Sequence, residues 1–363
     1  MPLTPEACRA QREWLRELNA AGFAVPHWPR EWGGGRSQAE QLIIHQELRR
    51  AKAPDLSAYV ISLHHLPGTL LAHGTEAQQR EHLAGVLDGT IWCQGFSEPE
   101  AGSDLAALRT VARRRGADYV ITGQKIWATV GLFAQWCLLL ARTDSEKPKR
   151  KGITCFLVDM RSPGVEVRGI RQATGATNFA EIFLDDVVVP AANVVGDVDG
   201  GWKVAQTTLA TERGPILLEF SDGLSDIMAD LTTLASTVEG GGVGAADNTA
   251  VLDRLAVAYE DAVSTRLLCD KVIDQMMARG APGPESSIVK LRFSEVAQSL
   301  TRLAVSLGGL PALVDADEVT AGRPWFLDHL DSWEFTISGG TNEIQRNLIG
   351  ERVLGLPRDP SMV

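Results

Sequence analysis

The stretch ADYVITGQKIWAT, residues 117–129, lies in the middle of the chain and differs in pattern from everything before it. It is rich in β-branched and aromatic residues, a composition typical of β-strands. Similar short runs follow, bounded by Gly, Pro and Asp: WCLLLART, GITCFLVDM, GVEVRGI and AEIFLDDVVVP. From about residue 90 to residue 199 we therefore expect antiparallel strands that form a small β-barrel.

The regions on both sides of these strands follow the helical repeat. REWLRELNAAGF, SQAEQLIIHQELRRA and TEAQQREHLAGVL precede them, and longer runs from GWKVAQTTLATER to TNEIQRNLIGERVL follow. Their apolar residues recur three and four positions apart, as in amphipathic helices. The expected fold is α+β and multidomain, with an N-terminal helical domain (1–88), a central antiparallel β-barrel domain (89–200) and a C-terminal helical bundle (201–363).

Composition excludes several classes of protein. The chain has 363 residues, of which 44% are hydrophobic and 22% charged, so we expect a folded core rather than disorder. A net charge of −11 argues against a nucleic-acid-binding surface. Apolar runs such as WCLLLA are too short to span a membrane, and no secretory leader is recognisable, so we expect a cytoplasmic protein.

Cysteine and histidine spacing indicates neither disulfides nor a metal site. The five cysteines are scattered without CxxC spacing, and the seven histidines form no HExxH motif. We therefore expect reduced, mostly buried thiols and no bound metal. The basic stretch KPKRK (147–151) lies between two expected strands, where a solvated hairpin tip is the main interpretation and a phosphate site the minor one.

Glu212 is a carboxylate in an unusual place. It continues an apolar helical stripe formed by Trp202, Ala205, Leu209 and Ile216. A buried carboxylate is costly unless it is paired or functional, and burial raises its pKa toward the range of a general base. Two interpretations stay open from the residues alone: an ion pair with Arg213, which follows directly, or a catalytic base.

Five segments together resemble one known family. They are CQGFSEPEAGSDLAAL (93–108), GQKIWATVG (123–131), ITCFLVD (153–159), FLDDVVVP (183–190) and SGGTNEIQR (338–346). Their order and approximate spacing are similar to those of the acyl-CoA dehydrogenases over nearly the whole chain. The resemblance implies an FAD enzyme that oxidises the Cα–Cβ bond of an acyl-CoA to an enoyl-CoA and passes electrons to an electron-transfer flavoprotein.

The resemblance also implies roles for individual residues. The implied cofactor-binding residues are Phe96, Ser97, Trp127, Thr129, Gly340, Thr341 and Glu343. The implied substrate-binding residues are Ser103, Arg213 and Gly339. The usual position of the catalytic base is that of Gly339, but some members place it on the helix of Glu212, directly before an arginine, so Glu212 is the implied base. The alternatives are that Trp127 is a core residue and that TNEIQ only caps the last helix.

Two features that hold a neighbouring subunit's flavin in the family are not recognisable. The Arg-x-x-Phe-Gly motif after the base-bearing helix has no counterpart, and Val305 stands where a glutamine is common. Because actinobacterial members that act on steroid side chains form mixed tetramers, we hypothesise a homologous second subunit, with self-association as the alternative. Gly339 would leave space for a bulky, branched or steroid-derived acyl group. A catalytically silent structural subunit and an acyl-CoA oxidase remain alternative functions.

Overall fold

The computed structural model describes residues 3–211, 216–237, 239–240, 243–244, 248–279, 283–314 and 323–358. The chain divides into two compact units, Met1–Thr211 and Glu212–Val363, called unit 1 and unit 2 below. Within the described ranges, every helix is too short or too polar to cross a lipid bilayer. The domain boundaries expected after residues 88 and 200 stay a prediction.

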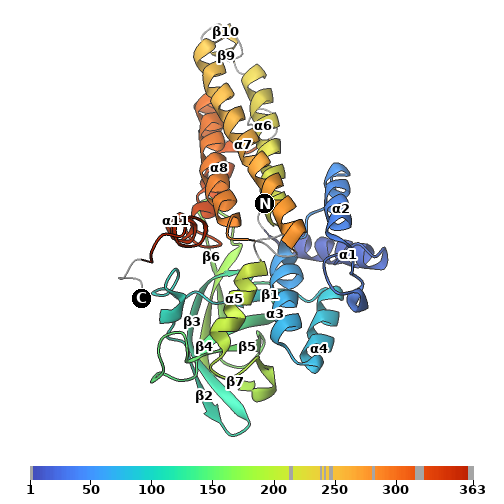
Figure 1. Cartoon of the computed structure of the whole chain (residues 1–363), viewed down its shortest axis with the longest axis vertical. Coiled ribbons are helices and arrows are strands. Elements are labelled where there is room, and N and C mark those ends of the chain that lie inside the picture. Colours follow the sequence, from blue (N-terminus) through green and yellow to red (C-terminus); the bar gives the residue numbers. More distant parts are fainter. Residues whose placement is uncertain are drawn as a thin grey trace. The chain divides into compact units, whose positions relative to one another are not determined.

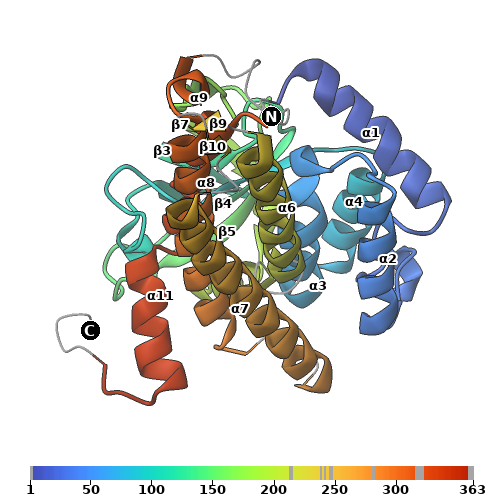
Figure 2. The ribbon, with the colours of Figure 1, turned by 90° about the horizontal axis from the view of Figure 1, so that it is seen from above.

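Unit 1 begins with helices that have well-defined starting residues. The hydroxyls of Thr4, Ser37 and Thr75 each accept a backbone hydrogen bond at the start of a helix, and two of them form full capping boxes. Figure 2 shows these helices on one side of the strands. The helices of unit 1 are α1 (Pro5–Ala20), α2 (Gln38–Arg50), α3 (Leu66–His73), α4 (Glu76–Leu87) and α5 (Gly201–Thr211), with a π-helix at Ile61–His65.

One eight-stranded sheet forms the rest of unit 1 (Figure 1). Its strands run in the order β6-β7-β3-β2-β4-β5-β8, and β1 pairs with β4. The strands are β1 (Trp92–Gly95), β2 (Val111–Arg115), β3 (Asp118–Thr129), β4 (Trp136–Arg142), β5 (Ile153–Asp159), β6 (Val165–Ile170), β7 (Phe179–Pro190) and β8 (Val194–Val195).

The expectation of a closed antiparallel barrel was wrong. Strands β6 and β8 stand at opposite ends of the strand order, so the sheet is open. Two pairings, β1 with β4 and β2 with β4, are parallel. The alternation of residues in a strand reports which side chains are buried, but it does not report which strands pair or in which direction.

The two faces of the sheet bury different cores. On β4 and β5, Leu138, Leu140 and Leu157 pack with the helices α1, α3 and α4. The alternate residues, including Leu139 and Phe156, pack with β3 and β7. All five cysteines are free and buried, as expected. The KPKRK stretch is exposed between β4 and β5, which confirms the hairpin tip.

Unit 2 is a set of helices around one apolar core, and α6, α7 and α8 pack lengthwise against one another (Figure 1). The helices are α6 (Ile216–Thr237), α7 (Thr249–Arg279), α8 (Ser286–Gly308), α9 (Pro311–Val314), α10 (Trp325–Ser332) and α11 (Asn342–Leu348). The short strands β9 (Glu239–Gly240) and β10 (Val243–Gly244) form a hairpin. A π-helical turn, Ile349–Val353, follows α11.

Candidate active site

The segment after β1 carries three of the predicted site residues. Phe96 is buried, Ser97 is partly exposed and Ser103 is exposed in the following loop. Between them, Glu98 and Ala101 exchange two backbone hydrogen bonds of 3.1 and 3.0 Å, which close a tight turn. The turn therefore presents Ser97 and Ser103 at the surface of unit 1 while Phe96 is anchored in the core.

Trp127 is an exposed aromatic residue held in a left-handed backbone conformation. Its φ is 61° and its side chain is 56% exposed. The cause is a β-bulge, because Ile126 and Trp127 on β3 stand opposite Glu181 alone on β7. Non-glycine residues rarely adopt positive φ, and such strain is concentrated at functional sites. The interpretation of Trp127 as a core residue was wrong.

The bulge joins the two predicted flavin-contacting segments. The backbone N–H of Ile126 donates to the carbonyl oxygen of Ser97 at 3.0 Å. Ser97, which supplies the acceptor, and Thr129, three residues after Ile126 on β3, are both partly exposed. In the described part of the chain, neither hydroxyl has a hydrogen-bond partner. The structure therefore brings Ser97, Trp127 and Thr129 together.

These residues fit a flavin. A planar ring ligand needs an apolar face and hydrogen-bonding groups at its rim. The exposed indole of Trp127 offers the face, and the unsatisfied hydroxyls of Ser97 and Thr129 offer the rim groups. The indole is supported from one side by Phe179, whose ring centroid lies 6.2 Å away in an edge-on arrangement.

A buried ion pair lies behind this segment, and the sequence did not predict it. The Lys125 ammonium is fully buried and donates to the Glu98 carboxylate at 2.8 Å and to the Phe96 carbonyl at 3.2 Å. Burial lowers the pKa of Lys125, and the charge of Glu98 opposes this. Burial acts to raise the pKa of Glu98, but Lys125 and hydrogen bonds from Thr110 and Arg109 outweigh it, so the pKa lies below its ordinary value.

In unit 2, the predicted glycine turn has the geometry that only glycine adopts readily. Gly339 and Gly340 have φ values of 61° and 89°. Thr341 caps α11 by accepting from the backbone N–H of Ile344 at 3.3 Å, so the capping role proposed for this segment is confirmed. Glu343, which follows in the first turn of α11, is exposed and lies 3.6 Å from Arg346.

Two side chains from neighbouring helices hold this turn. Lys290 on α8 donates to the carbonyl of Gly340 at 2.7 Å, and Gln345 on α11 donates to the carbonyl of Gly339 at 2.8 Å. Burial lowers the pKa of Lys290 to about 8, and Glu343 opposes this shift. Neither residue was predicted from the sequence: Lys290 belongs to none of the quoted motifs, and Gln345 lies within SGGTNEIQR but was assigned no role.

Glu212 and Arg213 lie outside the described residues. The helix that precedes them, α5, ends at Thr211 and is fixed to α3 by a 2.7 Å hydrogen bond between Thr208 and Thr69. Ala205 and Thr208 are fully buried on one face of α5. Residue 212 follows them at spacings of seven and four, which continue that face in a helix.

Glu334 is a second carboxylate that the sequence analysis did not consider. It precedes the glycine turn of unit 2 and is partly buried. Burial, with a contribution from Asp331, raises the pKa of Glu334 to about 7. Its raised pKa sets it apart from Glu98, whose pKa lies below its ordinary value. Its pKa makes it the natural control for any test of Glu212.

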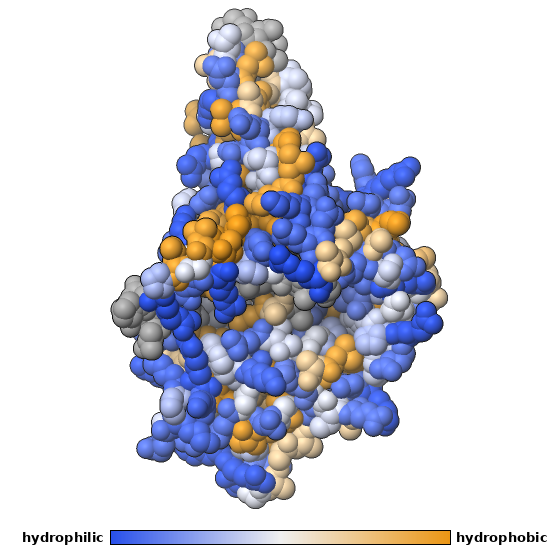
Figure 3. Space-filling model, in the orientation of Figure 1, coloured by the Kyte–Doolittle hydropathy of each residue, from blue (hydrophilic) through white to orange (hydrophobic). Residues whose placement is uncertain are grey.

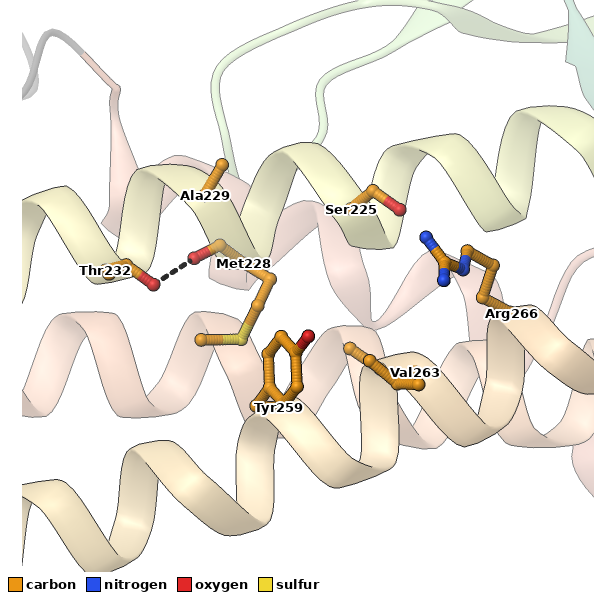
Figure 4. A pocket seen from close by; sticks show the side chains of 8 residues that line it. Ser225, Met228, Ala229, Thr232, Tyr259, Val263 and Arg266 are labelled. Atoms are coloured by element: carbon orange, nitrogen blue, oxygen red, sulfur yellow. Dashed lines mark hydrogen bonds between the residues drawn. The ribbon is translucent and has the colours of Figure 1, made fainter.

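A cavity of about 240 Å³ in unit 2 does not resemble a redox site. It lies between α6 and α7, where Met228 and Tyr259 face each other and Arg266 stands at one end (Figure 4). Among the described residues that line it, Arg266 alone is charged. No group of three or more potential metal ligands occurs within the described ranges.

Sequence comparison matches all three domains of one family. The N-terminal domain of acyl-CoA dehydrogenases matches residues 4–90, the middle domain matches 93–187 and the C-terminal domain matches 199–354. Members of this family are flavoproteins, which agrees with the fit of Ser97, Trp127 and Thr129 to a flavin.

Individual proteins that resemble this chain are also acyl-CoA dehydrogenases. Acyl-CoA dehydrogenase IpdE1 of Mycobacterium tuberculosis is 38% identical over 98% of this chain and 90% of its own length. Acyl-CoA dehydrogenase FadE34 of the same organism is 40% identical over 94% of this chain, which spans only 46% of that relative's length. The solved structure of the Tcur3481-Tcur3483 steroid acyl-CoA dehydrogenase is 29% identical, with a TM-score of 0.85 over 98% of this chain and 94% of that one. The chain is thus an oxidoreductase that belongs to the acyl-CoA dehydrogenase family.

Proposed function

We propose that this chain binds FAD and converts an acyl-CoA thioester into a 2-enoyl-CoA, with Glu212 as the base that removes the α-proton. The observation that carries the proposal is the group formed by Trp127, Ser97 and Thr129 in a chain that matches all three family domains. Electrons would then pass to an electron-transfer flavoprotein.

The described residues would form part of the cofactor site. Trp127 would supply apolar surface, and the hydroxyls of Ser97 and Thr129 are available for hydrogen bonds to the ring edge. Phe96 is buried in the core of unit 1, so its proposed contact with the cofactor rests on the resemblance. The resemblance adds Gly340, Thr341 and Glu343. When bound, FAD would supply the acceptor for the hydride that leaves Cβ.

The base must be a carboxylate that is charged near neutral pH and close to Cα. Glu212 is proposed because in the sequence it follows the buried residues Ala205 and Thr208 at spacings of seven and four, the spacings of an apolar helical stripe. Arg213 and Ser103 would contact the substrate. The family position of Gly339 implies that its backbone N–H polarises the thioester carbonyl, which makes the α-proton more acidic.

A bulky acyl group is the proposed substrate class. Gly339 is exposed and has no side chain at the position where other members carry their base. The space left by a missing carboxylate would admit a branched or steroid-derived acyl chain. The similarity to a steroid acyl-CoA dehydrogenase supports this extension.

A homologous second subunit is the proposed partner. FadE34 is more than twice as long as the region that matches this chain, as expected if one long chain can combine two such subunits. The exposed surface of the helices in unit 2 includes apolar patches (Figure 3), a common mark of protein interfaces. The exposed apolar side chains of α7 include Leu252, Val257, Tyr259, Leu267 and Met277.

The test is anaerobic bleaching of the flavin by a panel of acyl-CoAs that includes steroid thioesters. The chain would be assayed alone and coexpressed with a homologous subunit. We expect Glu212→Gln to retain FAD and lose bleaching, whereas Glu334→Gln should retain both. Loss of bleaching in Glu334→Gln with normal bleaching in Glu212→Gln would transfer the role of base to Glu334.

A catalytically silent structural subunit is the second candidate. The observation in its favour is that Val305, which packs against the core of unit 2, replaces the glutamine common in the family. The isolated chain and its complexes would then lack FAD bound to this subunit. An acyl-CoA oxidase would instead bleach normally and release peroxide in air at the rate of substrate turnover.

A further inference from the structure

Lys125 and Glu98 form an ion pair that the proposed mechanism does not use. Lys125 is among the largest fully buried side chains, and the side chain of Glu98 is 8% exposed. Glu98 also accepts hydrogen bonds from the backbone N–H groups of Arg109 (2.6 Å) and Thr110 (2.9 Å). Both charges are therefore fully paired within unit 1.

Stability alone does not account for this pair. Removing two charges from water costs several kcal/mol per ion, and well-packed apolar residues of similar volume often stabilise a core equally well or better. A geometric requirement is a second explanation for the pair, and the contacts of Lys125 and Glu98 show what it would fix.

The pair ties three successive residues to β3. Lys125 binds the Phe96 carbonyl and the Glu98 carboxylate, and the N–H of Ile126 binds the carbonyl of Ser97, which lies between them. Because the next residue along β3 is Trp127, these bonds fix the Ser97 segment relative to the strained indole. Tight packing supports this, since a Cβ added to Gly95 would lie 2.8 Å from the Cys137 sulfur and 3.4 Å from Lys125 Cγ.

We propose that Lys125 is a positioning residue, which holds Ser97 in register with Trp127 and Thr129 so that the three together bind the flavin ring. This inference rests on the proposed function. Lys125 does not itself contact the cofactor; it acts through the Phe96 carbonyl and through Glu98. Its charge is essential because a neutral side chain of the same length would leave the carboxylate and the carbonyl without their donor.

The test compares Lys125→Met with Leu15→Ala, a truncation at a fully buried position of α1 in the same unit. Both variants should lose thermal stability. The preparation would be the chain alone or with a coexpressed homologous subunit, whichever retains flavin. We expect Lys125→Met to raise the FAD dissociation constant by about tenfold or more and to shift the flavin absorption spectrum, as for loss of a charge-assisted hydrogen bond. Leu15→Ala should stay within about twofold of wild type.

Measurements at lower pH distinguish a positioning role of Lys125 from a contribution to the overall stability of the protein. In Lys125→Met, Glu98 lacks its counter-ion, so its pKa rises and it takes up a proton more readily. Lowering the pH should therefore recover part of the stability lost by the variant, while its FAD affinity relative to wild type at the same pH stays low. Recovery of both together would overturn the inference, as would an FAD affinity equal to that of Leu15→Ala. Failure of wild type to bind FAD in any preparation would refute the proposed function, and the inference with it.

Discussion

Substitution of Lys290 tests the contribution of a partly buried amine that donates a hydrogen bond to the glycine turn of unit 2. Lys290 donates to the Gly340 carbonyl at 2.7 Å and reaches the Asn342 side-chain oxygen at 3.3 Å. Its pKa is lowered from 10.5 to about 8 because the charge is partly buried. Lys290→Met removes the charge and both hydrogen bonds while keeping a side chain of similar length.

The pH dependence follows from the direction of this shift. Unfolded Lys290 keeps its proton up to about pH 10.5, whereas folded Lys290 loses it near pH 8. Between these values the unfolded state binds more protons, so the contribution of Lys290 to the free energy of unfolding rises with pH. A displacement of this size corresponds to about 3 kcal/mol at most, and to about 1–2 kcal/mol for a side chain that water partly reaches.

Urea unfolding of wild type and Lys290→Met between pH 7 and 10.5, in the same cofactor state, measures this contribution. Other titrating groups cancel in the difference between the two proteins. We expect the stability advantage of wild type to grow by about 1–2 kcal/mol over this range. The exposed Lys151 supplies a control, since Lys151→Met should show no such growth. A difference between wild type and Lys290→Met that does not change with pH would refute the reasoning.

Three further outcomes are expected. Trp127→Ala should weaken FAD binding by about tenfold, since stacking on the indole is lost, while Phe23→Ala, at another exposed aromatic, should leave the FAD dissociation constant unchanged. Gly339→Ala places a Cβ at a φ of 61°, so it should lower the free energy of unfolding in urea by about 1 kcal/mol. It should also raise KM more for bulky than for linear acyl-CoAs. Equal changes in KM would contradict the proposed space for a bulky acyl group at Gly339. Cys155 should react with a thiol reagent only as fast as the chain unfolds, because burial raises the pKa of its thiol far above the ordinary value; rapid labelling of the native chain would contradict this.

Local sequence patterns predicted well which segments are helices and which are strands, because the spacing of apolar residues differs between these two kinds of element. The zone from about residue 90 to 199 is the sheet, and the regions around it are helical, as the spacing of apolar residues indicated. The expectation of a closed antiparallel barrel failed because strand pairing depends on contacts that are distant in the sequence: β6 and β8 do not pair with each other, and β1 and β2 pair with β4 in parallel. No local pattern distinguishes a parallel neighbour from an antiparallel one.

Sequence motifs predicted the residues of the candidate site. They did not predict Lys125 and Lys290, which donate hydrogen bonds to the site segments. The hydrogen bond between Ile126 and Ser97 brings the two predicted segments together, yet nothing in GQKIWATVG alone shows that Trp127 is exposed by a bulge opposite Glu181. Lys125 lies in a strand in which polar and apolar residues are mixed, so the sequence does not indicate that it is buried. Its burial is understood only once the position of Glu98 is known. The role of Glu212 stays a prediction, because it rests on a helical stripe and a resemblance.

Lys125 and Lys290 solve the same physical problem in separate units. The irregular segments that contain Phe96 and Gly340, both proposed to lie at the cofactor, cannot satisfy all their carbonyl groups by regular pairing, and an unpaired buried carbonyl is costly. In each unit a lysine on a neighbouring regular element supplies the donor: Lys125 on β3 to Phe96, and Lys290 on α8 to Gly340. A long side chain can do this from a neighbouring strand or helix, so the loop keeps its shape without a regular pairing partner for these carbonyl groups. The prediction for Lys290 and the inference for Lys125 therefore test one principle in two independent places.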